Sequence, residues 1–264
     1  MAIFLLFLSL VLANESNEEK SNLVKVEVLK SHNTYNNEPF YLLIRLNIKD
    51  GWHTYWRNPG DSGMPTDIQF ETQDNIKISD IIWTELPQRF PFDDMVNFGY
   101  DKVQNLIVKV DPNNDNKDIT IKANVYWLVC KTECIPQDTT LTITIPYSET
   151  PNSNKENLTL INDLIKSSPI HQDVTYSSAK IDGDYFILET NDNLFKDNEF
   201  VFFPYHSGFF ANTISPIIEK NDENWILKFK LDEYKIENPD KFEGLIVIGD
   251  KENAKAVEVS IPIE

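Results

Sequence analysis

The residues of this chain that are best suited to chemistry are its two cysteines, Cys130 and Cys134, which lie in the stretch WLVCKTECIP. Paired cysteines form a structural disulfide, ligate a metal or act as a redox-active dithiol, in which the thiolate is the reacting species. If residues 131–133 form a three-residue hairpin loop, the cysteines lie nearly opposite each other. Directly opposed residues at a non-hydrogen-bonded position have Cα atoms about 4.5–5.5 Å apart, which a disulfide accepts. The spacing therefore permits a disulfide.

The three uses of the pair are not equally supported by the residues around it. A disulfide that closes so short a loop stabilises a fold by only about 2 kcal/mol on the chain-entropy model, so the pair would be a weak staple. A metal site needs further ligands, and the histidines show no spacing typical of zinc binding; they are His32, His53, His171 and His206. We therefore expect no metal and no cofactor. A redox dithiol is favoured, and a structural disulfide remains the alternative.

The elements that must position the pair are predominantly β-strands. Alternating apolar and polar residues predict strands over residues 23–31, 40–56, 105–112, 119–130 and 140–146, with turn signals such as KDG and NPGDSGMP between them. Residues 149–168 are more polar and end in a short helical pattern, after which strand patterns resume. We expect an all-β fold of two immunoglobulin-like antiparallel β-sandwich domains joined by a linker with one short helix. The expected domains are residues 22–148 and 169–264, with the linker at 149–168.

The N-terminus and the net charge of the chain indicate its cellular compartment and exclude some classes of partner. An apolar run of about ten residues at positions 3–12, followed by small residues, predicts a signal peptide over residues 1–13, although no Lys or Arg precedes the run. Export would place the cysteines in an oxidising compartment, where disulfides persist. The net charge of −18 argues against nucleic acid as a partner and disfavours an anionic membrane surface.

Three blocks of the sequence together resemble a known family. GWHTYWRNPGDSGMPT (Gly51 to Thr66), IIWTELPQRFPFDDMVNFGYDKVQNLIVKV (Ile81 to Val110) and VYWLVCKTECIPQDTTLTITIP (Val125 to Pro146) are similar to the N-terminal periplasmic region of DsbD-type thiol:disulfide interchange proteins. The cysteine spacing agrees with the ScsB-like branch. The resemblance covers residues 22–148 well and the second domain only loosely.

The resemblance implies an immunoglobulin-like module in the periplasm of a Gram-negative bacterium. Such a module takes electrons from a membrane electron-transfer subunit of the DsbD/ScsB type. It passes them to periplasmic thioredoxin-like or isomerase proteins, including copper-resistance thiol proteins and cytochrome c maturation factors. Cys130 and Cys134 occupy the matching positions. The chain would then be a protein-disulfide reductase component that lacks the membrane domain of the family.

The same resemblance suggests which residues surround the pair. Tyr55 and His53 alternate with Trp52, Thr54 and Trp56 and so share one face of a strand. The family's aromatic strand places Tyr55, and with it His53, beside the cysteines; otherwise both are ordinary solvent-facing residues.

Residues 89–100, which we call the cap segment, match the family's cap loop in position. In this role a ring from Phe90 or Phe92 would cover the disulfide, while Asp93 and Asp94 would raise the pKa of a nearby thiol by charge repulsion. Otherwise the phenylalanines simply pack on the sandwich edge.

The charges inside the hairpin loop oppose each other, because Lys131 favours a thiolate and Glu133 disfavours it.

A different class of function also fits the composition. Aromatic strands such as WHTYW and the apolar stretch at residues 201–210 suit a non-catalytic binding or docking module, in which the disulfide would be inert. The reactivity of the disulfide separates this alternative from thiol:disulfide exchange.

Overall fold

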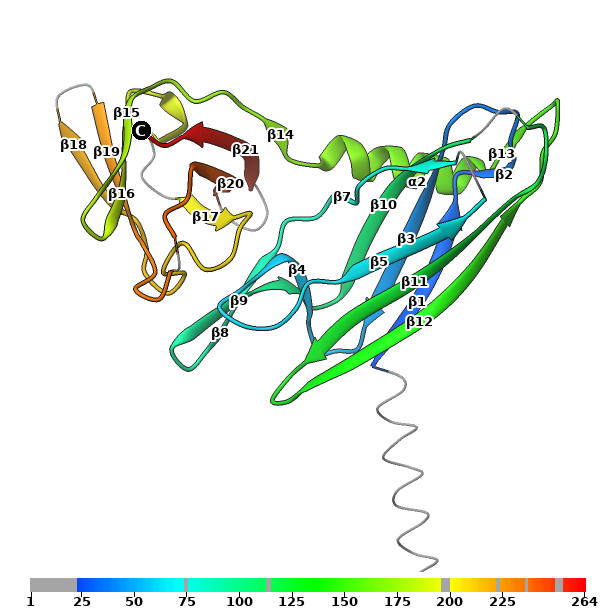
Figure 1. The fold of residues 1–264 in the computed structure, drawn as a ribbon, viewed down its shortest axis with the longest axis horizontal. Helices are drawn as coiled ribbons and strands as arrows, with labels where there is room; N and C mark the ends of the chain where they lie inside the picture. Colours follow the sequence, from blue (N-terminus) through cyan, green and yellow to red (C-terminus); the bar gives the residue numbers. More distant parts are fainter. Residues whose placement is uncertain are drawn as a thin grey trace, which may run out of the picture. The chain divides into compact units, whose positions relative to one another are not determined.

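The computed structural model describes residues 23–73, 76–112, 115–195, 200–221, 224–235, 237–249 and 254–264, and these residues form mainly antiparallel β-sheets (Figure 1). The predicted signal peptide lies outside them. No helix within these ranges is long and apolar enough to cross a membrane. Within the described ranges the chain divides into two compact units: residues 23–54, 66–85 and 100–166 form the first, and residues 55–65, 86–99 and 167–264 form the second.

Two sheets form the framework of the first unit. One sheet has β3 (Phe40–Ile48) between β1 (Val24–Lys30) and β10 (Val103–Asp111), with the short strands β6 (Lys77–Ile78) and β7 (Ile82–Trp83) also paired to β10. The other sheet has the order β12 (Cys134–Ile145), β11 (Ile119–Cys130) and β5 (Asp67–Thr72). A short pair joins β2 (His32–Thr34) to β13 (Asn152–Ser153). The predicted alternation is confirmed in β11, where every second residue from Ile119 is buried.

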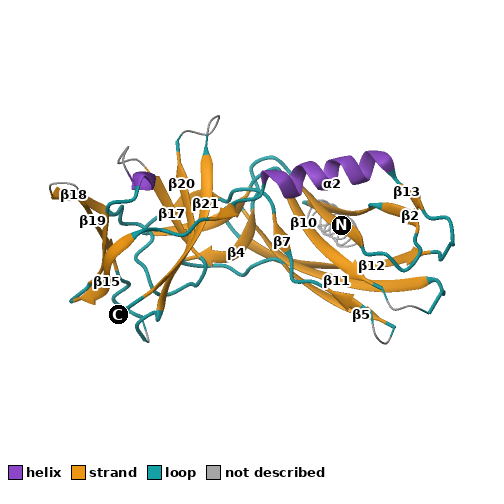
Figure 2. Cartoon of the chain, turned by 90° about the horizontal axis from the view of Figure 1, so that it is seen from above, coloured by secondary structure: helices purple, strands orange, loops and turns teal. Residues whose placement is uncertain are grey.

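Strand β3 is buried along one face and also at Leu43 on the other face, where a helix packs against it. Leu42 and Ile44 are buried on one face, whereas Leu43 on the other face packs in a cluster with Ile107 and Ile161. Ile161 belongs to helix α2 (Lys155–Ser167), which lies along the sheet (Figure 2). The side-chain oxygen of Asn154 accepts a hydrogen bond from the backbone N–H of Asn157 and caps the helix. The helical pattern that was predicted within the linker is therefore part of the first unit.

The second unit contains two four-stranded sheets. One has the order β15 (Tyr176–Asp182), β16 (Tyr185–Thr190), β19 (Asn224–Lys230) and β18 (Ile217–Asn221). The other has the order β14 (Ile170–His171), β21 (Lys255–Pro262), β20 (Lys241–Ile248) and β17 (Phe200–Pro204). A short 3-10 helix (Asn193–Phe195) follows β16. The core of this unit is rich in stacked and edge-on phenylalanines, among them Phe186, Phe202, Phe229 and Phe242.

A further three-stranded sheet groups with the second unit although its residues were expected in the first domain. It consists of β4 (Thr54–Gly60), β9 (Met95–Tyr100) and β8 (Gln88–Phe92). The ring of Phe203 lies 6.1 Å from that of Trp56 and 5.1 Å from that of Phe98, measured between centroids. The side chain of Asn58 donates a hydrogen bond of 2.7 Å to the carbonyl of Pro204. These contacts explain the grouping, because they bury an aromatic face of the sheet on the C-terminal residues.

The same sheet corrects two local predictions. Residues 58–60 were expected in a turn but belong to β4, and the cap segment, expected as a loop, forms the β8–β9 hairpin. Asp93 at the hairpin tip has a φ of 51°, in the left-handed region that aspartate tolerates better than most residues. The acidic pair therefore makes a tight turn rather than interrupting the strands.

Candidate functional site

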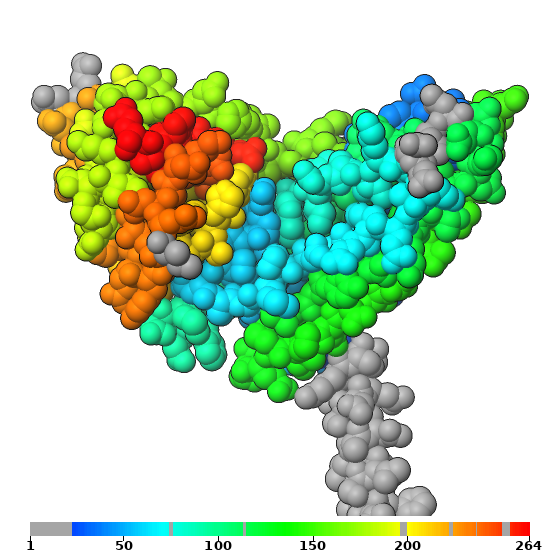
Figure 3. Space-filling model, viewed as in Figure 1, coloured from blue at the N-terminus to red at the C-terminus, as the bar shows by residue number. Residues whose placement is uncertain are grey.

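The cysteine pair lies at the tip of the long β11–β12 hairpin. The strand register pairs Cys130 directly with Cys134, with a three-residue loop between them as predicted. The two residues form a disulfide, and their Cα atoms are 4.2 Å apart. The hairpin is green in Figure 3 and forms a continuous strip of the visible surface.

The backbone of Cys130 is bound on its other side to His53. Cys130 N–H donates to the His53 carbonyl and His53 N–H donates to the Cys130 carbonyl, each with an N···O distance of 2.9 Å. Because both backbone groups of Cys130 point toward His53, its pairing with Cys134 is of the non-hydrogen-bonded kind, in which Cα atoms are closest. The result is a row of three directly opposed residues: His53, Cys130 and Cys134.

The two cysteines differ sharply in exposure. Cys130 is 3% exposed, whereas Cys134, the first residue of β12, is exposed. A disulfide sulfur or a thiolate reacts only where another sulfur can approach it. An incoming molecule can therefore reach Cys134 more easily than Cys130.

His53 is half-buried, and its burial lowers the pKa of the imidazole, with the charge of Asp101 acting in the opposite direction. At neutral pH the ring is therefore mainly uncharged, and it does not supply a fixed positive charge to a thiolate.

Tyr55 is 1% exposed and belongs to the second unit, with its neighbour Trp56 equally buried. The alternative of a solvent-facing Tyr55 is therefore wrong. Its ring packs on the turn at Gly63, where a Cβ atom would lie 2.3 Å from the ring. Burial raises the pKa of the Tyr55 hydroxyl, so the group is protonated at neutral pH. A role for Tyr55 beside the cysteines remains a prediction.

The predicted cap residues lie on the β8–β9 hairpin of the second unit. Phe90 in β8 is partly buried and pairs with Asn97, whereas Phe92 at the end of the strand is 49% exposed. Asp93 and Asp94 form the exposed turn between the strands. The hairpin is held by the guanidinium of Arg89, which donates to the backbone carbonyl of Asn212. Coverage of the disulfide by this hairpin remains a prediction.

The two charged loop residues are both exposed. The backbone N–H of Lys131 donates to the carbonyl of Glu133, at an N···O distance of 3.1 Å, and closes the loop. The Lys131 ammonium lies against the turn at Gly51, since a Cβ atom added there would be 3.5 Å from Nζ. The Lys131 side chain thus lies beside the neighbouring turn.

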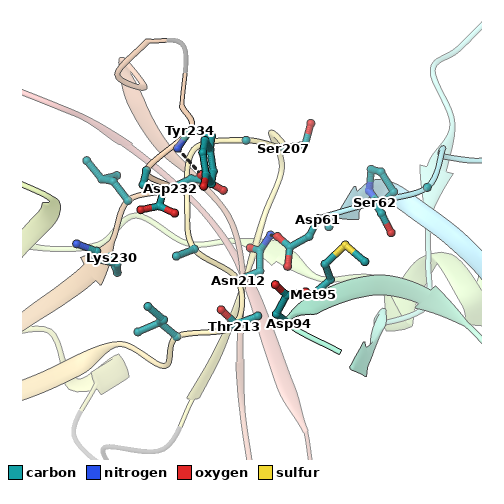
Figure 4. A pocket seen from close by; sticks show the side chains of 18 residues that line it. Asp61, Ser62, Asp94, Met95, Ser207, Asn212, Thr213, Lys230, Asp232 and Tyr234 are labelled. Carbon is teal, nitrogen blue, oxygen red and sulfur yellow. Dashed lines mark hydrogen bonds between the residues drawn. The ribbon is translucent and has the colours of Figure 1, made fainter. Parts of the chain in front are cut away.

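A separate surface pocket of about 840 Å³ lies within the second unit, lined by residues of the β4 and β9 ends and of the loops around Asn212 and Asp232 (Figure 4). Its carboxylate at Asp61 accepts hydrogen bonds of 2.7 Å from the Asn212 side chain and from the backbone N–H of Val96. Neither cysteine lines this pocket. The Asp61 carboxylate therefore links β9 to the loop at Asn212 within this unit.

No cluster of three or more potential ligands that could hold a metal ion occurs within the described ranges. The hairpin tip contains the two cysteines and the oppositely charged Lys131 and Glu133, and His53 pairs with Cys130 beside it. These side chains are suited to thiol chemistry.

The comparisons with known proteins agree with this chemistry. The family model described as "Thiol:disulfide interchange protein DsbD, N-terminal" matches residues 20–146. No curated protein matches the sequence. The structure is similar to the crystal structure of the N-terminal periplasmic domain of ScsB from Proteus mirabilis, with 15% identity and a TM-score of 0.64, over 91% of this chain and 94% of that chain.

A second solved structure, the reduced DsbD N-terminal domain of Neisseria meningitidis, has 12% identity and a TM-score of 0.30, covering 50% of this chain and 90% of that chain. The ScsB likeness establishes the fold, and the family model covers both cysteines. Residues 20–146, which include both cysteines, match the family of N-terminal domains of DsbD-type thiol:disulfide interchange proteins, and this match together with the Cys130–Cys134 disulfide supports a thiol:disulfide exchange module in general.

Proposed function

We propose that this protein relays pairs of electrons to other thiol proteins through the Cys130–Cys134 disulfide, with Cys134 as the sulfur that reacts with the partner. The observation that carries the proposal is the disulfide itself, which joins one exposed and one buried cysteine at the tip of a hairpin.

The exchange takes place in two steps that balance sulfur bonds and electrons. In the reduced protein the Cys134 thiolate attacks one sulfur of a partner disulfide, a mixed disulfide forms, and the partner's other sulfur leaves as a thiolate. Cys130 then attacks Cys134, the internal disulfide re-forms, and the first partner sulfur leaves. The partner gains two electrons and this protein loses two.

The direction and the setting of the relay follow the family. The electrons come from a membrane electron-transfer subunit of the DsbD/ScsB type, which re-reduces the pair by the reverse of the same steps. The acceptors are thioredoxin-like or isomerase proteins in the periplasm, and the relay serves disulfide isomerisation or cytochrome c maturation. The solved ScsB domain with the similar fold is described as periplasmic, which supports this setting.

The reduction potential tests the proposal directly. The purified protein is equilibrated in glutathione or dithiothreitol buffers and its free thiols are counted. A potential between about −270 and −180 mV, the span from thioredoxin to protein disulfide isomerase, is expected for a relay. A potential below about −300 mV, typical of structural disulfides, would instead support the inert binding module.

Single-cysteine variants test the order of attack. Cys130→Ser keeps the exposed cysteine and is expected to accumulate a mixed disulfide with an oxidised thioredoxin-like protein. Cys134→Ser is the matched control, since it keeps one thiol at a buried position, and it should form little adduct. Equal trapping by the two variants would contradict the assigned order.

A further inference from the structure

His53 and the two cysteines form one row across three neighbouring segments. The register places His53 opposite Cys130, and Cys130 opposite Cys134. Side chains of directly opposed residues in an antiparallel pair lie on the same face, with Cβ atoms about 4.5–5.5 Å apart. The side chains of His53 and Cys130 are therefore neighbours on one face of the sheet, and His53 lies on the opposite side of Cys130 from Cys134.

The buried sulfur has a chemical need that the exposed one does not share. Cys130 must lose its proton before it can attack Cys134, because the thiolate is the nucleophile. Its low exposure of 3% limits access of water to the thiol, and burial in general disfavours the charged form of a thiol. A proton acceptor attached beside the thiol would remove this obstacle.

We propose that His53 accepts the proton of Cys130 when this residue resolves the mixed disulfide. The proposal deepens the proposed exchange function and rests on it. In the step, the Cys130 S–H proton passes to an imidazole nitrogen while the Cys130 sulfur bonds to the Cys134 sulfur. The bond between Cys134 and the partner breaks, and its electron pair leaves with the partner thiolate. The imidazolium then returns its proton to solvent.

The surroundings of His53 suit a base more than a fixed cation. Burial lowers the pKa of its ring, and Asp101 opposes that effect only in part. A histidine that is mostly neutral at pH 7 is able to take up a proton during the reaction. Three segments lie next to His53 or the cysteines: the turn that precedes His53, the loop before β10 and the loop between the cysteines. Their charged residues are Lys49, Asp50, Asp101, Lys102, Lys131 and Glu133.

The two exchange steps can be followed separately with the aromatic disulfide 5,5′-dithiobis(2-nitrobenzoate) and the reduced full chain in stopped flow. Attack by Cys134 releases the first nitrothiobenzoate at a rate proportional to the reagent concentration. Closure by Cys130 releases the second at a rate independent of that concentration. His53→Gln is expected to slow the second release about 100-fold, at the lower end of general-base effects, with the first release unchanged.

The pH dependence and added imidazole distinguish a base from a merely structural residue. The second release should show an inflection below pH 6.5, the ordinary pKa of histidine, in the native protein and lose it in His53→Gln. Added imidazole should restore part of the rate in the variant. His32→Gln is the matched control, because His32 is also partly buried with a lowered pKa, and it should leave both releases unchanged.

The outcomes separate the inference from the function on which it rests. If the native protein releases no first equivalent, the exchange function itself fails. If the first release is normal and His53→Gln closes the disulfide within twofold of the native rate, the role of His53 is refuted. Equal slowing of both releases, or no rescue by imidazole together with an unchanged pH profile, would also refute it. His53→Asn repeats the test if the Gln variant does not fold.

Discussion

The packing of Phe98 on Phe203 allows a quantitative test of how the chain is divided. The two rings are edge-on, with centroids 5.1 Å apart and an interplanar angle of 71°, and both residues are buried. Such a pair contributes about 0.5–1.5 kcal/mol beyond the burial of its area. Phe98 lies in the predicted first domain and Phe203 in the second, so a coupling between them measures whether the β4–β9–β8 sheet packs on the C-terminal residues.

A double-mutant cycle of Phe98→Leu, Phe203→Leu and the double variant gives this coupling from urea unfolding curves. Each single substitution should reduce the free energy of unfolding by about 0.5–3 kcal/mol, and the double variant should lose about 0.5–1.5 kcal/mol less than the sum. Phe195 is the control partner, because it is equally buried but its ring packs against Phe200. Its cycle with Phe98 should be additive within about 0.3–0.5 kcal/mol. Equal coupling in the two cycles would refute the packing described for this sheet.

The other predictions concern single features of the fold. Asn58→Ala should lower the free energy of unfolding by about 1–3 kcal/mol, measured by urea unfolding, because the Pro204 carbonyl loses its 2.7 Å partner. Burial raises the pKa of Glu85 above its ordinary value of 4.5, so the folded state binds the proton more tightly, and stability should fall as the pH rises from 4.5 toward the raised pKa. Glu85→Gln should abolish that part of the pH dependence in a urea midpoint series. Reduction of Cys130–Cys134 should lower the free energy of unfolding by only about 2 kcal/mol, and a loss large enough to unfold the protein would show that the disulfide is needed as a staple.

The cysteine hairpin was predictable because every signal that defines it is local. Alternation fixes the strand that ends at Cys130, and the short loop fixes which residue lies opposite. The neighbour of Cys130 on its other side is different, because the pairing with His53 joins segments distant in the sequence. A strand pattern gives the face of His53 but not the strand or the register that it joins. The sequence therefore identified His53 as a candidate site residue but could not predict its pairing with Cys130.

The β4–β9–β8 sheet was less predictable for the same reason. Alternation at Tyr55 and Trp56 predicts that one of the two faces solvent, yet both are 1% exposed. Trp56 lies against the rings of Phe203 and Tyr205, and both of these residues lie in the predicted second domain. In the cap segment, Pro91 and the Asp93–Asp94 pair are typical of loops, but Pro91 fits in β8 and the acidic pair forms its turn. Residues that usually interrupt strands therefore led to the prediction of a loop, whereas the segment forms a hairpin that long-range packing stabilises.

The row of His53, Cys130 and Cys134 also explains why so short a disulfide suits exchange. The backbone of Cys130 is fixed by two hydrogen bonds to His53, whereas Cys134 adjoins an exposed loop. The hydrogen bonds that define the hairpin do not depend on the sulfur–sulfur bond, so the sheet can persist in both redox states. The loop that the bond closes is short, so breaking it releases little chain entropy, about 2 kcal/mol against a typical total stability of about 5–15 kcal/mol. A cross-link between distant strands would couple reduction to unfolding much more strongly. The weakness of this disulfide as a staple is therefore what allows it to open and close within an intact fold.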